Sequence, residues 1–313
     1  RLKQINMLET KPLTSRSTMT PFQTQLRETA DAVETALGRL LPVPMGQQSV
    51  VAEAMRYAAL GGGKRLRPFL VIETARMLGG DLDNAMIVGC ALECLHVYSL
   101  VHDDLPCMDD DDVRRGKPTV HKRYDEAMAV LAGDGLLTYA FELLAGDGAH
   151  EDPAIRARLV LELARAGGTH GMIGGQVVDM TVAEDARDTA LITHLQAMKT
   201  GALIRFATKA GALISDAQAH DLVALDRYAD ALGLAFQIRD DILDVEGDAD
   251  LVGKAVGKDA DLGKATFVSL LGLTEAKEKA QALGDTARAA LAPYGEKAQA
   301  LVGTVDFVLQ RQH

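Results

Sequence analysis

The sequence predicts an all-α protein, because its apolar residues recur at helical spacing and it offers little that would form a sheet. From residue 21 onward apolar side chains recur every three or four positions, as at Leu26, Ala30, Val33 and Leu37. Aromatic residues make up only 4% of the chain, and alternating β-branched runs are few. The pattern continues to the end of the sequence, so we expect a single helical domain rather than a mixed fold.

Glycine and proline residues mark the ends of the expected helices in chain order. These breaks lie at Gly61 to Gly63, Gly79 with Gly80, Pro106, Gly116 with Pro118, Gly146 to Gly148, Gly167 with Gly168, and Gly247. One helix should therefore end at the first glycines and the next should start near Pro68. Pro106 disfavours helical geometry at Leu105, so another helix should end just past Asp104. About ten or more helices result.

The first eighteen residues do not share this pattern. They carry four Lys or Arg residues against Glu9 alone and lack a sustained apolar period. We expect residues 1–18 to be a flexible extension, either a transit peptide or an added leader, since Met19 resembles a natural start. Residues 19–313 should form one domain, because 48% apolar residues suffice for a sizeable core.

Charge and hydropathy exclude two classes of partner. Lys and Arg total 33 against 44 Asp and Glu, and a net charge of −11 argues against a protein that must neutralise nucleic-acid phosphates. The longest apolar candidate, Ala85 to Val101, contains Glu93 and His96. We therefore expect no transmembrane segment.

The three cysteines, Cys90, Cys94 and Cys107, follow no secretory segment, so we expect reduced thiols and a cytoplasmic protein. Cys90 and Cys94 lie four apart on one expected helix without a second pair. Buried apolar packing is therefore favoured over a zinc site.

An acidic cluster from Asp103 to Asp112 packs six carboxylates into ten residues. At about 4 Å and an effective dielectric near 20, each like-charge pair costs roughly 4 kcal/mol, so close convergence requires cations or solvent. Carboxylates at a helix C-terminus also oppose the helix dipole. Magnesium would explain the cluster, and a solvated acidic loop is the alternative.

A second acidic set contains Asp240, Asp241 and Asp244, and Asp240 and Asp244 lie one helical turn apart. Mg²⁺ binds well to a few carboxylates together with substrate phosphates. Two facing aspartate sets would suit a magnesium-diphosphate site, whereas an exposed acidic helix face is the alternative.

Basic residues complement these sets. They are Lys64, Arg65 and Arg67 beside an expected helix N-terminus, Arg114 and Arg115 after the first acidic cluster, and Lys199 with Thr200. Each group alone could be surface charge. Together they fit a site for two anionic substrates, only one of them bridged through metal.

Two other motifs fail. Gly257 to Lys264 has the wrong spacing for a phosphate-binding loop, and Ala265 stands where a hydroxyl is required. Glu93 and His96 form one ExxH pair, whereas a di-iron bundle needs two. His96 lies seven residues before Asp103, on nearly the same helix face, so a role at the phosphate site is favoured.

These residues resemble the trans-prenyltransferase family, specifically its bacterial farnesyl diphosphate synthases, from about residue 20 onward. The shared segments are GGGKRLRP, ECLHVYSLVHDDLPCMDDDDVRRGKPTVH, GGQVVDM, KTGALIRFA, FQIRDDILD and GKDADLGKAT, in the family's order. The resemblance implies an isoprenoid synthase helical bundle around a central cavity, assembled as a homodimer.

The resemblance also implies roles for individual residues. It assigns Lys64, Arg67, His96 and Arg115 to isopentenyl diphosphate, and Arg114, Lys199 and Lys254 to the allylic diphosphate. Lys258 and Lys264 would join them in a region of variable spacing. Thr200 and Gln237 match positions that stabilise the carbocation, and Gln176 and Asp179 match a segment near the cavity. Asp103, Asp104 and Asp109, with Asp240 and Asp244, would hold magnesium, three ions when substrate is bound.

The implied reaction condenses isopentenyl diphosphate with dimethylallyl and then geranyl diphosphate to give farnesyl diphosphate. The allylic carbon–oxygen bond breaks, the isopentenyl double bond attacks the carbocation, and the departing diphosphate takes the released proton. No protein nucleophile is needed, but the walls must exclude water.

Product length depends on residues just before the first acidic cluster. Helical geometry places Ser99 one turn below Asp103 with Tyr98 flanking it, so both should help form the floor of the product tunnel. A large Tyr98 should stop growth near fifteen carbons. Tyr98 as an ordinary core residue, and a geranylgeranyl diphosphate synthase, are the alternatives.

Two alternative functions belong to other classes of protein. A terpene cyclase would have no use for Lys64, Arg67 and His96, and a non-catalytic partner subunit should have lost one aspartate set. Both features are intact here.

Overall fold

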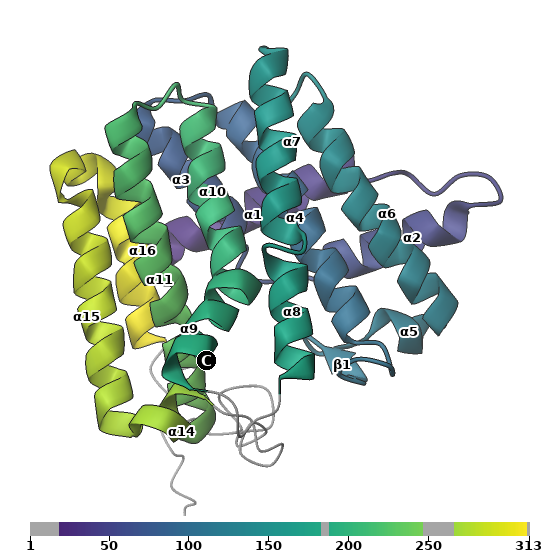
Figure 1. Cartoon of the computed structure of the whole chain (residues 1–313). Helices are drawn as coiled ribbons and strands as arrows, with labels where there is room; N and C mark the ends of the chain where they lie inside the picture. The colour runs from purple at the N-terminus through teal and green to yellow at the C-terminus, as the bar shows by residue number, and fades with distance from the viewer. Residues whose placement is uncertain (1–18, 183–187, 247–265, 312–313) are drawn as a thin grey trace, which may run out of the picture.

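Helices account for nearly all regular structure in the computed structural model, which describes residues 19–182, 188–246 and 266–311 (Figure 1). The first half contains α1 (Pro21–Leu40), α2 (Ser49–Ala59), α3 (Leu66–Leu78), α4 (Leu82–Asp103), α5 (Val120–Arg123), α6 (Glu126–Ala145) and α7 (Pro153–Gly167). The second half contains α8 (Met172–Thr181), α9 (Thr189–Gln196), the π-helical turn η2 (Ala197–Gly201), α10 (Ala202–Leu213), α11 (Ala219–Glu246), α14 (Phe267–Leu271), α15 (Leu273–Leu291), the 3₁₀ segment η3 (Ala292–Ala298) and α16 (Gln299–Gln310). The predicted all-α fold of ten or more helices is confirmed, and the predicted extension at residues 1–18 lies outside the described residues.

Side-chain caps fix several helix starts. Thr20 accepts a hydrogen bond from the Gln23 backbone N–H, and the Gln23 side chain accepts one from the Thr20 backbone, which forms a capping box ahead of Pro21. Asp81, which caps α4, accepts hydrogen bonds from the first turn in the same way. These caps satisfy backbone N–H groups that have no partner inside the helix and so define where α1 and α4 begin.

The helix after the first glycines starts near Pro68, as expected. It begins at Leu66, so Pro68 is its third residue. A proline is tolerated there because the first four N–H groups of a helix have no intrahelical partner.

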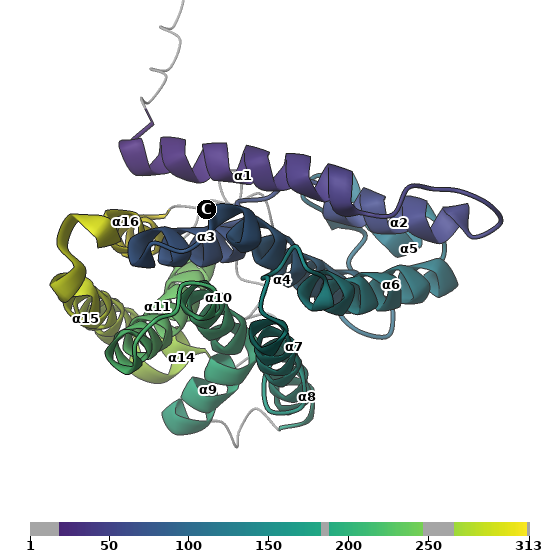
Figure 2. The same cartoon turned by 90° about the horizontal axis from the view of Figure 1, so that it is seen from above.

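The helices are arranged in layers around α4. Seen from above, α1 and α2 lie along one side, α3, α4 and α6 lie beneath them, and α7 and α10 lie on the opposite side (Figure 2). Because α4 packs against α3, α6 and α10, it is buried along most of its length, and its C-terminal end carries the first acidic cluster.

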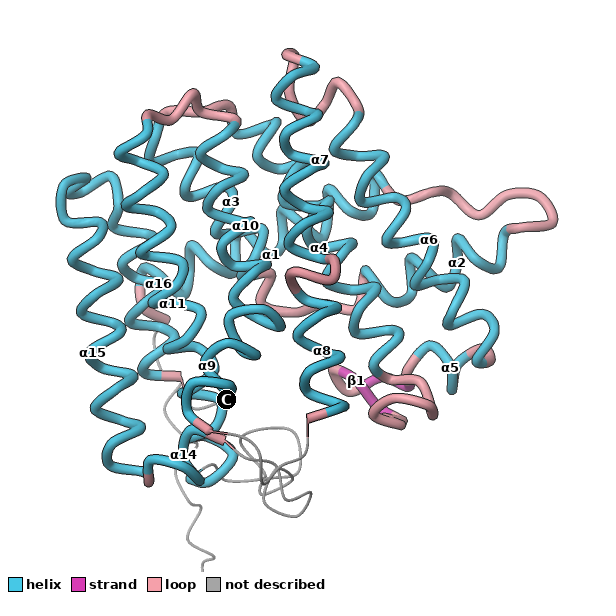
Figure 3. Tube along the Cα trace, viewed as in Figure 1, coloured by secondary structure: helices cyan, strands magenta, loops and turns pink. Residues whose placement is uncertain are grey.

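Within the described residues the strands are limited to β1 (Val113–Arg114) and β2 (Lys117–Pro118), which pair antiparallel with Val113 opposite Pro118 (Figure 3). This hairpin was not predicted, because two-residue strands are too short to show an alternating pattern. Arg115 and Gly116 form its turn with φ of 52° and 75°, and two positive φ angles are typical of a tight hairpin turn.

Two helices in the described part are long and apolar enough to cross a membrane, α4 and α6. Both pack against each other inside the protein, and 67% of the apolar window of α4 is buried. Core helices commonly share this composition, so the pattern is weak evidence for a membrane span.

Candidate active site

The first acidic cluster begins where α4 ends, as predicted. Asp103 is the last helical residue and Asp104 caps the helix. The chain then folds back, because the Asp109 backbone N–H donates to the Asp103 carbonyl at 2.8 Å. This bond brings Asp109 beside Asp103 although six residues separate them.

Several charges meet at Asp103. Burial raises the pKa of Asp103 to about 6, and the nearby Asp109 and Asp104 carboxylates add to the rise, whereas Lys199 and Arg114 oppose it. The two cations therefore do not fully offset the cost of burying Asp103 beside two other carboxylates. The set Asp103, Asp104 and Asp109 therefore fits a divalent cation, which would relieve that repulsion.

Asp104 already has a counterion. It is buried, and Arg114 Nε lies 2.8 and 2.9 Å from its two carboxylate oxygens, while Nη2 lies 2.5 Å from Oδ1. Burial raises the pKa of Asp104 even with this fork of hydrogen bonds. Arg114 comes from β1, so the unpredicted hairpin positions one of the predicted catalytic cations.

Lys199, whose charge acts on Asp103, lies in the π-helical turn η2 with Thr200. π-Helical turns are rare in proteins, and those that occur are often found at functional sites. Lys199 Nζ lies 2.7 Å from Asp179 Oδ2 on α8. Gly175 on α8 permits this approach, because a Cβ at that position would lie only 2.5 Å from the Lys199 backbone nitrogen.

The second acidic set lies on α11. Asp240 Oδ1 lies 2.7 Å from Nη2 of Arg311, near the end of the chain. Asp241 is buried and accepts hydrogen bonds from Gln237 Nε2 at 3.2 Å and from the Phe267 backbone N–H at 2.8 Å. Asp241 thus connects α11 to α14 and orients Gln237, while Asp240 and Asp244 lie one helical turn apart on α11.

The basic group, which comprises Lys64, Arg67, His96 and Arg115, lies next to the glycines that precede α3. Arg67 Nη1 lies 3.1 Å from His96 Nε2, and Arg115 donates to the Gly62 carbonyl. Burial lowers the pKa of His96 well below its usual value, and the neighbouring arginines lower it further. Because a guanidinium only donates, Nε2 must accept, so the imidazole is neutral with its proton on Nδ1.

These cations lie close enough to disfavour each other. Burial lowers the pKa of Lys64, with Arg311 adding to the effect and Asp240 opposing it. Burial likewise lowers the pKa of Arg67, where Arg115 adds to the effect and Glu93 and Asp240 oppose it. Mutually repelling, partly desolvated cations form a site that an anion would stabilise.

Arg65 does not belong to this group, although the sequence placed it there. It is buried, with φ of 48°, and pairs with Glu93 at 2.6 Å and Glu34 at 2.5 Å. Its charge is therefore used to hold α1, α3 and α4 together. The same contact explains Glu93, which the failed di-iron motif left without a role.

Tyr98 and Ser99 lie on α4 just before the acidic end. Tyr98 is buried and its ring packs edge-on against His102, with centroids 5.7 Å apart. Burial raises its pKa to about 12, with Asp103 adding to the rise. The Ser99 hydroxyl donates back to the His96 carbonyl at 2.8 Å.

Other predicted residues divide into two groups. Lys254, Lys258 and Lys264 lie outside the described residues. Cys90 and Cys94 are buried free thiols, and Cys107 is an exposed one. Both Cys90 and Cys94 are fully buried in the hydrophobic core, which confirms the predicted apolar packing, and this burial raises the pKa of Cys90 to about 12 and that of Cys94 as well.

The sequence reasoning missed Arg311. No motif surrounds it, and it reaches Asp240 only because α16 returns alongside α11. Its guanidinium also lies over the Phe236 ring at 3.9 Å and donates to the Phe236 carbonyl. The available signal was one basic residue after an apolar helix, which has no specificity alone.

Comparison with known proteins places this geometry in context. The sequence profile described as polyprenyl synthetase matches residues 48–302. A farnesyl diphosphate synthase of Geobacillus stearothermophilus is 49% identical over 255 residues, covering 81% of this chain and 86% of the relative. A geranylgeranyl diphosphate synthase of Cyanophora paradoxa is 38% identical over 303 residues, covering 94% and 100%. The apo crystal structure of an FPP/GFPP synthase from Zymomonas mobilis superposes with a TM-score of 0.83 at 45% identity, covering 92% of this chain and 98% of that one.

Proposed function

The chain belongs to the polyprenyl synthetase family, and we propose that it is a prenyltransferase that makes farnesyl diphosphate. It condenses isopentenyl diphosphate with dimethylallyl diphosphate and then with geranyl diphosphate. The predicted relationship to bacterial farnesyl diphosphate synthases agrees with the 49% identity to one of them, and the geranylgeranyl-forming relative is more distant.

One observation carries the proposal: two acidic sets and one basic group meet in the same part of the fold. Lys199 and Arg114 act electrostatically on Asp103, and Asp240 acts on both Lys64 and Arg67. An enzyme that binds two diphosphates and ionises only one of them needs a metal-binding half and a purely cationic half. Here Lys199 and Arg114 lie within electrostatic reach of Asp103, and Asp240 borders the group of Lys64 and Arg67, so a metal-bound diphosphate and a directly bound one would lie side by side.

Magnesium is the expected cofactor. Asp103, Asp104 and Asp109 would hold it on one side and Asp240 with Asp244 on the other, with three ions in the substrate complex. When bound, the ions supply positive charge to the leaving diphosphate.

The chain's own residues perform the remaining work. Lys199 and Arg114 hold the allylic diphosphate and stabilise its negative charge as the carbon–oxygen bond breaks. Arg67, Arg115, Lys64 and neutral His96 hold isopentenyl diphosphate, so that its double bond faces the allylic carbon.

Thr200 and Gln237 lie beside the reacting carbons and stabilise the carbocation. Asp241 orients the Gln237 amide through its hydrogen bond. A new carbon–carbon bond forms, and the proton lost from the isopentenyl unit passes to the departing diphosphate.

Tyr98 and Ser99 set product length in this proposal. A buried aromatic ring one turn before the acidic end would block a chain growing along α4, which favours fifteen carbons over the geranylgeranyl alternative. A terpene cyclase would not need the Arg67–His96 pair, and a non-catalytic subunit would not need both aspartate sets.

We also propose that two copies form a homodimer through α6. This helix passes the length and composition test for a membrane span, yet only 39% of its apolar window is buried, and Val130 and Leu131 are exposed. Burying that face against a second copy would remove it from water. A reducing, cytoplasmic compartment fits the free thiols.

The direct test supplies dimethylallyl and isopentenyl diphosphates with and without Mg²⁺ and identifies the dephosphorylated products by mass spectrometry. A magnesium-dependent fifteen-carbon alcohol is expected. Asp103→Asn should abolish it, while Asp83→Asn, at the exposed opposite end of α4, should not. A twenty-carbon product would overturn the proposed length, and no condensation by folded protein would overturn the enzymatic role.

A further inference from the structure

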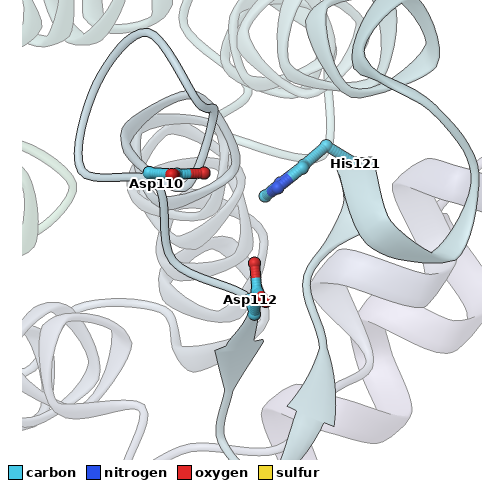
Figure 4. A group of neighbouring side chains, drawn as sticks. All are labelled: Asp110, Asp112 and His121. Atoms are coloured by element: carbon cyan, nitrogen blue, oxygen red, sulfur yellow. The ribbon is translucent and has the colours of Figure 1, made fainter.

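A second group of metal-ligating side chains lies where the acidic loop meets the β hairpin. Asp110, Asp112 and His121 each offer one ligand atom, and these atoms lie within 4.8 Å of one another. Figure 4 shows the three side chains together: Asp110 comes from the acidic loop, Asp112 from the residue just before β1, and His121 from α5. None of the three is among the aspartates assigned to magnesium above.

The hydrogen bonds of His121 leave one ring nitrogen ready to bind a cation. The Thr119 hydroxyl donates to the Asp112 carbonyl at 3.4 Å, so its oxygen accepts from His121 Nδ1 at 3.1 Å. His121 is only 7% exposed, and its Nε2 is buried without a hydrogen-bond partner. A proton held on Nδ1 leaves a lone pair on Nε2, which is the form of histidine that binds metals.

The backbone holds the three ligands in place. Pairing of β1 with β2 brings Asp112 beside Thr119, whose backbone N–H donates to the Asp112 carbonyl at 3.0 Å. The Asp110 backbone N–H donates to the Leu105 carbonyl at 3.2 Å, and the φ of Asp110 is 51°, in the left-handed region. Such a left-handed residue is uncommon outside glycine and marks a constrained position.

We propose that Asp110, Asp112 and His121 form a separate divalent-cation site that accepts an imidazole ligand. Two carboxylates and one imidazole suit Zn²⁺ or Co²⁺, whereas Mg²⁺ prefers oxygen ligands. Lys122 Nζ lies 2.8 Å from Asp112 Oδ1, so Asp112 would offer its other oxygen to the ion. A bound ion would fasten the acidic loop to α5 without requiring a diphosphate.

The test measures Zn²⁺ binding to the full chain by equilibrium dialysis, without magnesium or diphosphate, and compares single variants. Asp110→Asn is the most informative change, because Asn tolerates the left-handed backbone and Asp110 is exposed, so only the charge is lost. We expect one Zn²⁺ per chain that depends on Asp110 and His121, with its binding at least about tenfold weaker in Asp110→Asn and His121→Gln, while ions held by the magnesium aspartates are unaffected by these two changes.

Two controls separate this site from its surroundings. Asp109→Asn changes the adjacent residue of the magnesium set and should keep Zn²⁺ binding, and His170→Ala removes an exposed histidine elsewhere. Circular dichroism verifies the fold of each variant. Equal affinity in the wild type and Asp110→Asn, loss of binding only in Asp109→Asn, or no binding in the wild type would each overturn the proposal.

Discussion

Arg311 Nη2 lies 2.7 Å from Asp240 Oδ1, so a residue at the end of the described chain neutralises an aspartate of the second acidic set. The Arg311 side chain is 8% exposed and that of Asp240 is 35% exposed. The pair therefore supplies a cation at a position where magnesium is proposed to bind in the substrate complex.

Removing this cation should make the protein more dependent on magnesium. Without a counterion, Asp240 should destabilise the magnesium-free fold, by about 1 kcal/mol for a partly exposed pair. Magnesium should then raise the melting temperature of Arg311→Gln more than that of the wild type, because binding to the folded state is stabilising. Differential scanning calorimetry with and without Mg²⁺ measures both effects.

Arg239→Gln provides the matched control. Arg239 donates to the Arg311 carbonyl, so this change loosens the same chain end and leaves the Asp240 pair in place. An equal magnesium response in both variants would contradict the assigned role of Arg311.

Neutral His96 should make stability depend on pH. Its pKa lies well below the usual value in the folded chain, so at acid pH the unfolded chain binds a proton that the folded chain does not. The stability that His96 contributes is present above about pH 6.5 and is lost as the pH falls, by at most about 1.4 kcal/mol per pH unit. Urea unfolding at about pH 7.5 and about pH 5.5 tests this.

In His96→Gln the loss of stability at the lower pH should be smaller than in the wild type. His170→Gln changes an exposed histidine and should leave the wild-type pH dependence intact. If His96→Gln and the wild type lost equal stability on acidification, His96 would not be held neutral by its burial beside Arg67 and Arg115.

Gly175 should be required for activity more than for folding. An added Cβ would lie 2.5 Å from the Lys199 backbone nitrogen and 2.7 Å from its Cα, so Gly175→Ala must displace the turn that carries Lys199 and Thr200. A displacement near 1 Å at a reacting group costs on the order of 100-fold, so kcat/KM should fall by about 10- to 100-fold.

Gly38→Ala is the matched control, because nothing lies within 4 Å of a Cβ placed at that position of α1. It should retain activity and gain about 0.5 to 1 kcal/mol of stability from helix propensity. Wild-type kcat/KM in folded Gly175→Ala would show that Lys199 tolerates the shift.

The sequence predicted the acidic parts of this site better than the basic parts. Pro106 specifies locally where α4 ends, so Asp103 and Asp104 could be placed from neighbouring residues alone. The role of Arg65 could not be predicted in this way, because the sequence does not distinguish the roles of Lys64, Arg65 and Arg67 within one short segment. Whether each points toward substrate or toward Glu93 depends on helices that pack from elsewhere in the chain.

Long-range and very short elements were the least predictable. Arg311 reaches Asp240 across 71 residues of sequence through the packing of α16 on α11. The β1–β2 hairpin positions Arg114 and Asp112 but is too short for a periodic signal. His121 lies at the end of a segment shared with the family, but only the hydrogen bonds of the folded chain show that its Nε2 is buried without a partner.

Tyr98 should control product length. Its ring is 5% exposed and packs against His102 on the turn that leads to Asp103, so it occupies space next to the proposed site of the allylic diphosphate. Tyr98→Ala opens that space, and the product should shift from fifteen toward twenty carbons, as measured by chromatography of the dephosphorylated alcohols.

Leu92→Ala removes a fully buried side chain two turns farther from Asp103 and should cost about 2 to 5 kcal/mol of stability without lengthening the product. Both variants remove a buried side chain of α4 and leave a cavity, so the comparison tests the position of the cavity relative to Asp103. An unchanged product distribution in active Tyr98→Ala would make Tyr98 an ordinary core residue, and lengthening in both variants would show that loosened packing of α4, rather than this ring, sets the limit.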